Sequence, residues 1–128
     1  MPEDLLFEYA IIRVVPRVER EEFLNVGVVL YCAKKKYLKT LYEVNEERLK
    51  VFADIDITEI DCYLNAFERI CNGDAASSAI ARLPVAERFR WLTATRSTIL
   101  QTSKVHPGLC KDPEEMLQRL FRQMVQQH

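Results

Sequence analysis

The sequence is poor in glycine, since only Gly27, Gly73 and Gly108 occur in 128 residues. The loops that cradle phosphate groups in Rossmann and P-loop proteins each need several glycines within one short segment. Nucleotide binding through either loop is therefore excluded. A Gly-x-Ser-x-Gly turn is also missing, which removes the nucleophile elbow of an α/β-hydrolase.

Histidine is scarce too, with His106 and His128 as the only two residues of this type. They do not form the His-x-His or His-x-x-x-His spacing that holds a metal, and no two of the four cysteines form a Cys-x-x-Cys pair. We therefore expect neither a metal nor a cofactor. Without an export signal, the cysteines are expected to be free thiols, mostly in the core. They are Cys32, Cys62, Cys71 and Cys110.

Long apolar segments are absent as well, because no window approaches the roughly 20 apolar residues that cross a bilayer. The N-terminus lacks the basic start and the cleavage site of a signal peptide. The hydrophobic fraction of 48% and the charged fraction of 29% are ordinary for a globular protein. We expect residues 1–128 to form a single cytoplasmic domain with its own core and no membrane contact.

The net charge of −1 neither favours nor opposes a nucleic-acid partner. Its distribution is uneven, because residues 43–74 are mainly acidic among their charged side chains and residues 82–104 mainly basic. The two segments are expected to attract each other within the fold or to remain solvated. The alternative is an anionic ligand or partner at the basic segment.

The sequence does contain two nearly uninterrupted apolar runs near its N-terminus. They predict two strands, Phe7–Val15 and Phe23–Cys32, at the centre of a sheet. Pro16 is expected to end the first strand, because proline cannot continue the hydrogen-bond ladder. Alternation in the second strand places five apolar residues on one face, toward the main core. They are Leu24, Val26, Val28, Leu30 and Cys32.

A third strand, Tyr37–Val44, is expected to complete an antiparallel meander, with Lys39 and Glu43 on a face in solvent. One later strand is expected at Ser97–Val105, and the residues His106–Gly108 are expected to turn the chain out of it.

Helix signals separate these strands. Asn45 is expected to cap a short helix, and Thr58 a longer one that ends at Asn72 and Gly73. Residues 85–92 favour a helix, although Phe89 and Trp91 also alternate as in a strand. Asp112 followed by Pro113 predicts the start of a C-terminal helix. The fold class is therefore α+β, with a mostly antiparallel sheet of about four strands and helices packed on one face.

Candidate binding residues come from two segments that are expected to form the walls of one site. Three residues interrupt the apolar runs, namely Arg13, Asn25 and Gly27. A polar or missing side chain inside a sheet requires either an interaction partner or a functional role. The segment 88–106 is rich in guanidinium, hydroxyl and amide groups, which suit an anion. The predicted binding set is Arg13, Asn25, Gly27, Arg90, Arg96, Ser97, Gln101 and His106.

Structural interpretations stand beside these functional ones. Asn25 can anchor the neighbouring loop, and Gly27 can make room for a packed side chain or a bulge. A hydrolase triad would need His106 as base and Ser97 as nucleophile, but the sequence does not place them together. No catalytic residue is predicted, and we lean against an enzyme.

Four segments carry a family resemblance, namely residues 9–16, 22–30, 88–97 and 106–108. Together they resemble the signature blocks of an uncharacterised bacterial family, domain of unknown function 3037. The resemblance implies a small bacterial cytoplasmic protein and carries no established activity. Its association with genes beside HipA-like kinases implies a partner or a regulatory role.

Three functions follow as hypotheses. The first is a non-enzymatic protein-interaction or regulatory module, accessory to a HipA-like kinase. The second is a nucleic-acid or phosphate-ligand binder that uses the segment Arg88–His106. The third is a small hydrolase or nuclease around His106. A homo-oligomer is compatible with each of them.

Overall fold

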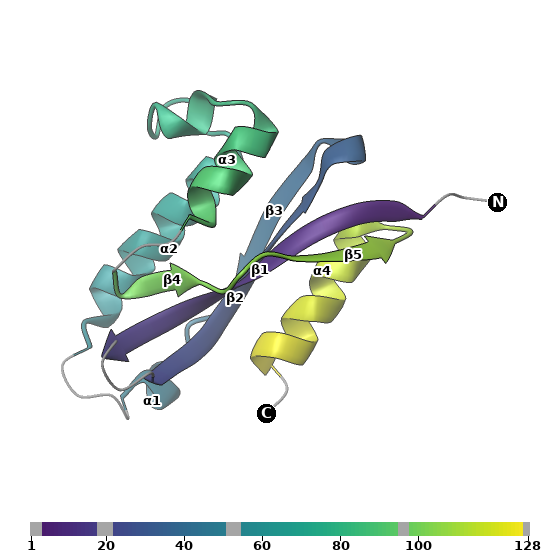
Figure 1. Ribbon diagram of the computed structural model, residues 1–128. Helices are drawn as coiled ribbons and strands as arrows, with labels where there is room; N and C mark the ends of the chain where they lie inside the picture. Colours follow the sequence, from purple (N-terminus) through teal and green to yellow (C-terminus); the bar gives the residue numbers. More distant parts are fainter. Residues whose placement is uncertain (1–3, 18–21, 51–54, 95–97, 127–128) are drawn as a thin grey trace.

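The computed structural model describes residues 4–17, 22–50, 55–94 and 98–126 (Figure 1). All strand pairs are antiparallel, in the order β3-β2-β1-β4, and β5 also pairs with β1. The strands are β1 (Leu5–Arg17), β2 (Glu22–Cys32), β3 (Tyr37–Tyr42), β4 (Leu100–Thr102) and β5 (His106–Cys110). The predicted α+β class and the N-terminal meander are confirmed, with five strands in place of about four.

Of the four described α-helices, three begin where a polar side chain caps free N–H groups, and α3 begins after Pro84 without such a cap. They are α1 (Glu46–Leu49), α2 (Ile57–Cys71), α3 (Val85–Leu92) and α4 (Pro113–Phe121), with the short turns η2 (Ala33–Lys35) and η3 (Ile80–Arg82) and the π-helical turn η4 (Arg122–Gln126). Asn45 and Asp112 are caps as predicted. The cap of α2 is Asp56 instead of Thr58, since its carboxylate accepts from the backbone N–H of Thr58 at 3.0 Å. Among these described helices, none is both long and apolar enough to cross a membrane.

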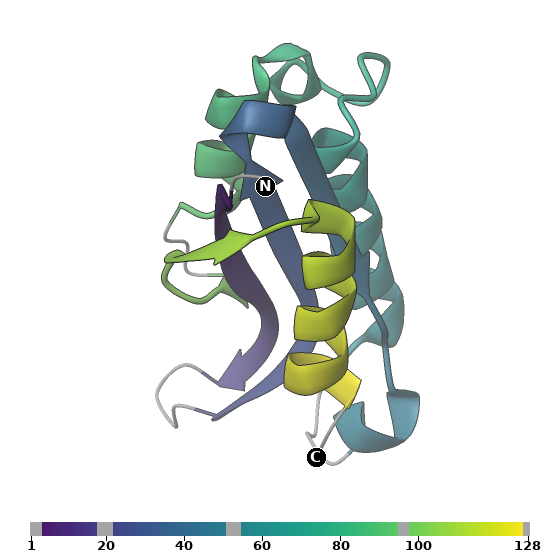
Figure 2. The ribbon, with the colours of Figure 1, turned by 90° about the vertical axis from the view of Figure 1, so that its right-hand side faces the viewer.

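Helices lie on both faces of the sheet, so the prediction of helices on one face is wrong. Figure 2 shows α4 on one side of the sheet and α2 and α3 on the other. Each side has its own core cluster of buried apolar residues. The physical reason is β1 itself, whose residues are apolar on both faces, as in strands that are buried on both sides.

A β-bulge in β2 changes which residues reach each core. Asn25 and Gly27 oppose consecutive residues of β1, so Val26 is an extra residue in β2. Leu24 and Val26 therefore lie in the core on the side of α2 and α3. The apolar residues after the bulge lie in the core on the side of α4, and they are Val28, Leu30 and Cys32. The predicted single apolar face of this strand is wrong, because alternation does not count a bulge.

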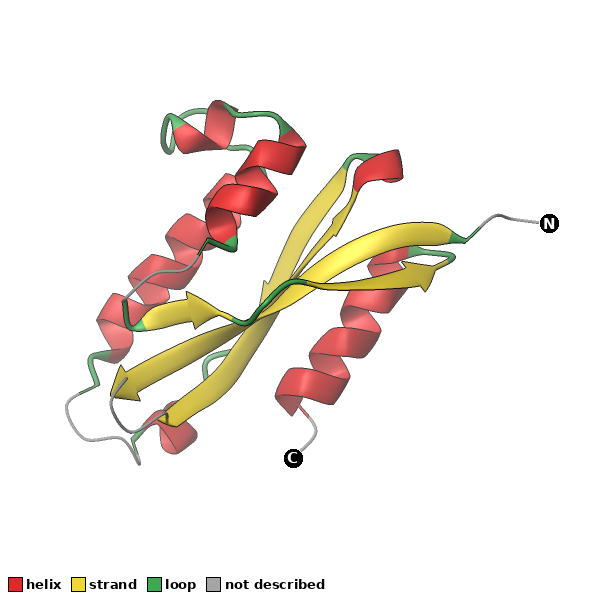
Figure 3. Cartoon of the chain, viewed as in Figure 1, coloured by secondary structure: helices red, strands yellow, loops and turns green. Residues whose placement is uncertain are grey.

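The second half of the sheet also differs from the prediction. The later strand is limited to Leu100–Thr102, and the predicted turn at His106–Gly108 is the start of β5. Figure 3 shows β4 and β5 following each other along β1. Pro107 is tolerated because β5 is an edge strand. Gly108 is needed because an added Cβ would lie 2.6 Å from the ring of Phe7.

The first and the third strand of the meander each differ from the prediction. β1 continues past Pro16, with an irregularity between Val14 and Arg17. The outer face of β3 does not stay in solvent, because Lys39 forms an ion pair of 3.1 Å with Glu114 of α4. Helix α4 therefore covers the face that was expected to be open.

At Gly27 of β2, the backbone of β3 lies close enough to leave no room for a side chain. A Cβ there would lie 2.7 Å from the carbonyl oxygen of Leu41 and 2.9 Å from the Cβ of Tyr42. We predict that Gly27→Ala lowers the free energy of unfolding by about 2 kcal/mol, because backbone atoms cannot move without loosening the β2–β3 pairing. Urea denaturation measures this change, and an unaltered midpoint would contradict the assigned packing.

Tyr37 and Glu114 join β3 to α4. The Tyr37 hydroxyl donates to the Glu114 carboxylate, which also accepts from Lys39. Burial, and then this carboxylate, raise the pKa of Tyr37. The hydrogen bond from Tyr37, followed by that from Lys39, lowers the pKa of Glu114 from its usual 4.5. Glu114 therefore adds stability that is complete above pH 4.5 and is lost as the pH falls through the lower folded pKa.

We predict that Tyr37→Phe lowers the free energy of unfolding at pH 7 by about 1 kcal/mol, a modest value because the Glu114 side chain is 38% exposed. The loss should shrink at about pH 3, where Glu114 approaches neutrality in both states. Tyr31→Phe is the matched control, because no hydrogen bond of its hydroxyl is found among the described residues. Equal losses at both pH values would refute the assignment.

Candidate binding strip on the sheet

Three of the predicted residues lie side by side across three strands. Arg13 of β1 is directly opposite Asn25 of β2 and directly opposite Gln101 of β4. Opposite residues of an antiparallel pair share a face, and this is the face that carries α4. Phe23, two residues before Asn25, extends the row on the same face. We call Phe23, Asn25, Arg13 and Gln101 the polar strip.

Arg13 holds the centre of the strip. Its Cζ lies 4.3 Å from the centroid of the Phe23 ring, within the range of a cation–π interaction. The Phe23 side chain is 49% exposed, so the pair lies at the surface. The Nε of Arg13 is buried without a hydrogen-bond partner. Among the side chains that the structure describes, those of residues 4–16, 23–50, 55–94 and 98–126, no carboxylate forms an ion pair with this guanidinium.

Asn25 connects the strip to the C-terminal turn η4. Its Nδ2 donates to the carbonyl oxygen of Met124 at 3.1 Å. A carbonyl only accepts, so the amide nitrogen must face Met124 and the Oδ1 must point away from it. That Oδ1 is buried without a partner. Asn25 also lines a hollow of about 210 Å³ together with Glu43 and Val125.

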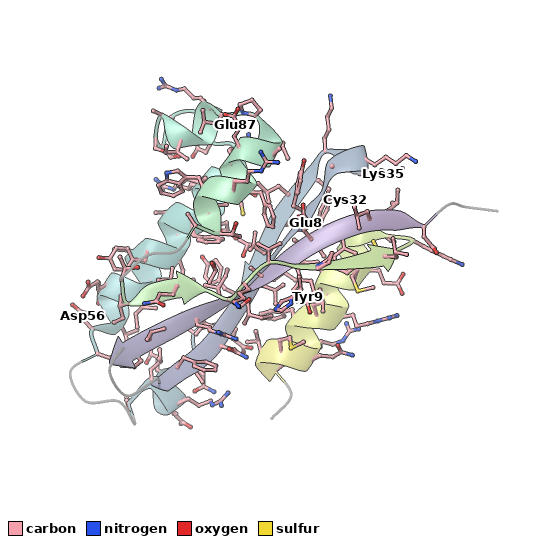
Figure 4. The ribbon with its side chains drawn as sticks, in the orientation of Figure 1. Glu8, Tyr9, Cys32, Lys35, Asp56 and Glu87 are labelled. Carbon is pink, nitrogen blue, oxygen red and sulfur yellow. The ribbon has the colours of Figure 1, made fainter. Side chains whose placement is uncertain are left out.

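Gln101 of β4 and His106 of β5 lie on the same face of the sheet as Arg13. The Nε2 of Gln101 donates to the carbonyl oxygen of Thr98 at 2.9 Å, which fixes its amide near the loop before β4. The exposed His106 pairs with Tyr9, and their ring centroids are 5.4 Å apart. Figure 4 shows Tyr9 on the α4 side of β1. Tyr9 precedes Arg13 by four residues, or about 13 Å along the strand.

The remaining predicted residues do not join this row. Gly27 is buried between β1 and β3, which supports its structural interpretation as a position that makes room for packing. Arg90 is exposed on α3, a helix on the opposite side of the sheet. Arg96 and Ser97 lie outside the described residues. Among the described residues predicted from the second segment, Gln101 lies directly opposite Arg13, and His106 lies farther along β1, opposite Tyr9.

Other residues of the basic segment serve the packing of α2 and α3. Arg88 donates to the carbonyl oxygen of Leu83 at 3.0 Å and lies against Gly73. Trp91 is 37% exposed and, with Tyr63, lines a hollow of about 230 Å³ between the two helices. Three of the four free cysteines are buried, as expected, and Cys62 is exposed on α2.

The chemistry of the strip is that of binding. A guanidinium, two amides and an aromatic ring supply donors, one positive charge and a flat apolar surface. His106 contacts an aromatic ring, and the structure shows no hydroxyl or carboxylate bonded to it in the described parts of the chain. Within those parts there is also no cluster of three side chains that could hold a metal.

Phe23 and Tyr9 were missed as parts of a candidate site. Both were treated as sheet residues because aromatic side chains in strands are usually buried. Tyr9 is recognisable in the sequence, since it alternates with Arg13 on one face. Phe23 is recognisable only once the antiparallel pairing of Arg13 with Asn25 is known.

The sheet and its helices define a class, an α+β protein with a row of polar residues across its central strand. The chain belongs to the family described as Protein of unknown function (DUF3037), whose model matches residues 9–125. This match confirms the resemblance carried by the sequence segments. No curated protein and no solved structure matches the chain.

Asn25 offers a direct test of how the strip is joined to η4. We predict that Asn25→Ala lowers the free energy of unfolding by about 1 kcal/mol, because the carbonyl of Met124 loses its donor. Hydrogen exchange at residues 122–126 should accelerate. Asn65→Ala, on the exposed face of α2, is the control that should leave these amides unchanged. Unchanged exchange in Asn25→Ala would disprove the tether.

Proposed function

We propose that this protein is a non-enzymatic interaction module that binds a partner protein through the polar strip. The observation that carries the proposal is Arg13. This half-buried residue lies against the exposed Phe23 and has no carboxylate partner among the side chains described, those of residues 4–16, 23–50, 55–94 and 98–126. Such a group gains free energy when a carboxylate of another molecule reaches it.

The surroundings of Arg13 suit an acidic side chain or a C-terminal carboxylate of the partner. A guanidinium presents two parallel N–H groups to a carboxylate, which fixes the orientation of the bound group. Asn25 and Gln101 flank it with amides, and Phe23 offers exposed apolar surface. Arginine and aromatic residues together are the usual centres of protein interfaces.

The family resemblance suggests which partner to test first, a HipA-like kinase. A module of this kind would act as an accessory or a regulator of the kinase and needs no catalytic group of its own. A bacterial, cytoplasmic protein with a single domain is part of the same proposal.

A phosphate-containing ligand or single-stranded nucleic acid is the second candidate. The same Arg13 and Phe23 pair supports it, because a guanidinium binds phosphate and an exposed ring can stack on a base. Binding through Arg90 would use a different surface, on α3. The net charge of −1 gives such binding no general electrostatic support.

We predict that Arg13→Gln weakens binding of a purified HipA-like kinase by about 10- to 100-fold, because a charged hydrogen bond is lost. Isothermal titration calorimetry measures the affinity, and a thermal melt checks that the variant remains folded. Arg69→Gln, an exposed arginine on α2, is the control with unchanged affinity.

Three results would oppose the proposal. Equal affinity of Arg13→Gln and the parent chain would remove the strip as the binding site. A loss caused by Arg90→Gln alone would move the interface to α3. Salt-dependent binding of a 12-nucleotide oligomer that Arg13→Gln abolishes, without any binding of the kinase, would favour the second candidate.

A further inference from the structure

The turn η4 is attached to β2 at the part of the polar strip that contains Asn25. The carbonyl oxygen of Met124 accepts the hydrogen bond from the Nδ2 of Asn25, and the buried Val125 packs into the α4 core. The Nε2 of Gln126 donates to the Oε2 of Glu43 at 3.2 Å. Three consecutive residues of the turn therefore hold it on the sheet.

The attachment of η4 is weaker than that of α4, the helix that precedes it. The turn buries Val125, whereas α4 buries Pro113, Leu117 and Leu120. Its π-helical hydrogen bonds join residues five apart, a rare geometry that occurs mostly as single turns. The bond from Gln126 lies in solvent. Segments with few buried apolar contacts open at a lower free energy than the whole fold, so η4 can leave the sheet while α4 stays in place.

With η4 in place, the strip has two unmade hydrogen bonds. The Oδ1 of Asn25 is an acceptor and the Nε of Arg13 is a donor, and both are buried without a hydrogen-bond partner in the described part of the chain. Arg13 and Asn25 are directly opposite each other in β1 and β2. A buried polar atom without a partner is unfavourable, so a state in which both atoms are bonded gains free energy over the closed one.

The hollow of about 210 Å³ beside the attachment is lined by Asn25 and Val26 of β2 and by Val125 and Gln126 of η4. It is smaller than the roughly 300–1,000 Å³ of a pocket for a whole small molecule, so with η4 in place it admits only a small group. Opening of η4 removes two of its lining residues and uncovers the amide of Asn25.

We propose that η4 is a displaceable strap over the polar strip, and that a peptide segment of the partner replaces it there. This inference rests on the binding function proposed for the strip. The present partner of Asn25 is a peptide carbonyl, that of Met124, which shows the chemistry that fits. In the bound state the Nδ2 of Asn25 donates to a backbone carbonyl of the partner, and its Oδ1 accepts from a backbone N–H. Arg13 binds a carboxylate of the same segment.

A strap of this kind makes the affinity for the partner depend on the fraction of molecules in which η4 is open. The apparent dissociation constant equals the intrinsic constant divided by that fraction. While the closed state dominates, a variant that is open ten times more often therefore binds about ten times more tightly. A turn that serves only the stability of the fold would leave the affinity unchanged when it is loosened.

Two variants loosen the strap without changing the strip. Val125→Ala removes buried methyl groups, and Gln126→Ala removes the bond to Glu43. Hydrogen exchange at residues 122–126 should accelerate about tenfold in Val125→Ala and about threefold in Gln126→Ala, while exchange at residues 117–121 stays unchanged. The affinity for the purified HipA-like kinase, measured by isothermal titration calorimetry, should rise by the same factors.

Gln123→Ala is the matched control within the same turn. The Gln123 side chain is exposed, and no hydrogen bond that it forms is found among the described residues. Its exchange rates and its affinity should equal those of the parent chain. A thermal melt checks that each variant is folded, and Gln126→Ala keeps the test decisive if Val125→Ala unfolds, because its side chain is exposed.

In the complex, exchange at residues 122–126 should be faster than in the free protein, because the partner holds the strap open. Slower exchange there would make η4 part of the interface and would overturn the proposal. Unchanged affinity of the loosened variants would also overturn it, as would exchange of residues 122–126 only together with α4.

Failure of the proposed function gives a different result. If the kinase binds neither the parent chain nor the loosened variants, or if Arg13→Gln binds as the parent does, the strip is not its binding site. Exchange in the free protein then decides on the strap alone. Opening of residues 122–126 separately from α4 would support it, and opening of the two together would refute it.

Discussion

The structure depends on β1 being paired along both edges and packed on both faces. β2 occupies one edge, and β4 and β5 share the other. The first half of the strand sends its odd-numbered residues into the α4 core, and the second half sends its even-numbered residues into the core of α2 and α3. The first group is Leu5, Phe7 and Ile11, and the second is Ala10, Ile12 and Val14. A strand under these constraints must be apolar almost throughout.

Local sequence signals predicted the elements whose formation depends on near neighbours. The meander, α3 and the caps at Asn45 and Asp112 follow from alternation, spacing and side-chain hydrogen bonding. The errors arise where distant contacts decide. The bulge at Val26 depends on pairing with β1, and Pro107 is acceptable only because β5 is at an edge. Coverage by α4 depends on contacts such as Lys39 with Glu114, far apart in the chain.

The candidate site was predictable to a similar degree. Arg13 and Asn25 were conspicuous because they interrupt apolar runs, and the register places them next to each other. Gly27 was conspicuous for the same reason, but the bulge gives it a packing role. Arg90 shows the limit of composition, because a charge in the sequence does not state which side of a sheet its helix covers. That side is decided by the packing of Phe89 and Leu92 of α3 into one of the two cores.

The incomplete cover of β1 leaves two parts of the strand exposed. Each helix layer covers only part of the central strand, so the uncovered parts lie on opposite faces and toward opposite ends. Arg13 lies at one of them and Leu6 at the other. If helices covered the whole strand, both positions would need apolar side chains packed against those helices. The sequence instead places a cation at position 13, and Leu6 is paired with Leu109 of β5. Because both exposed parts belong to the same paired strand, their relative position is set by the sheet.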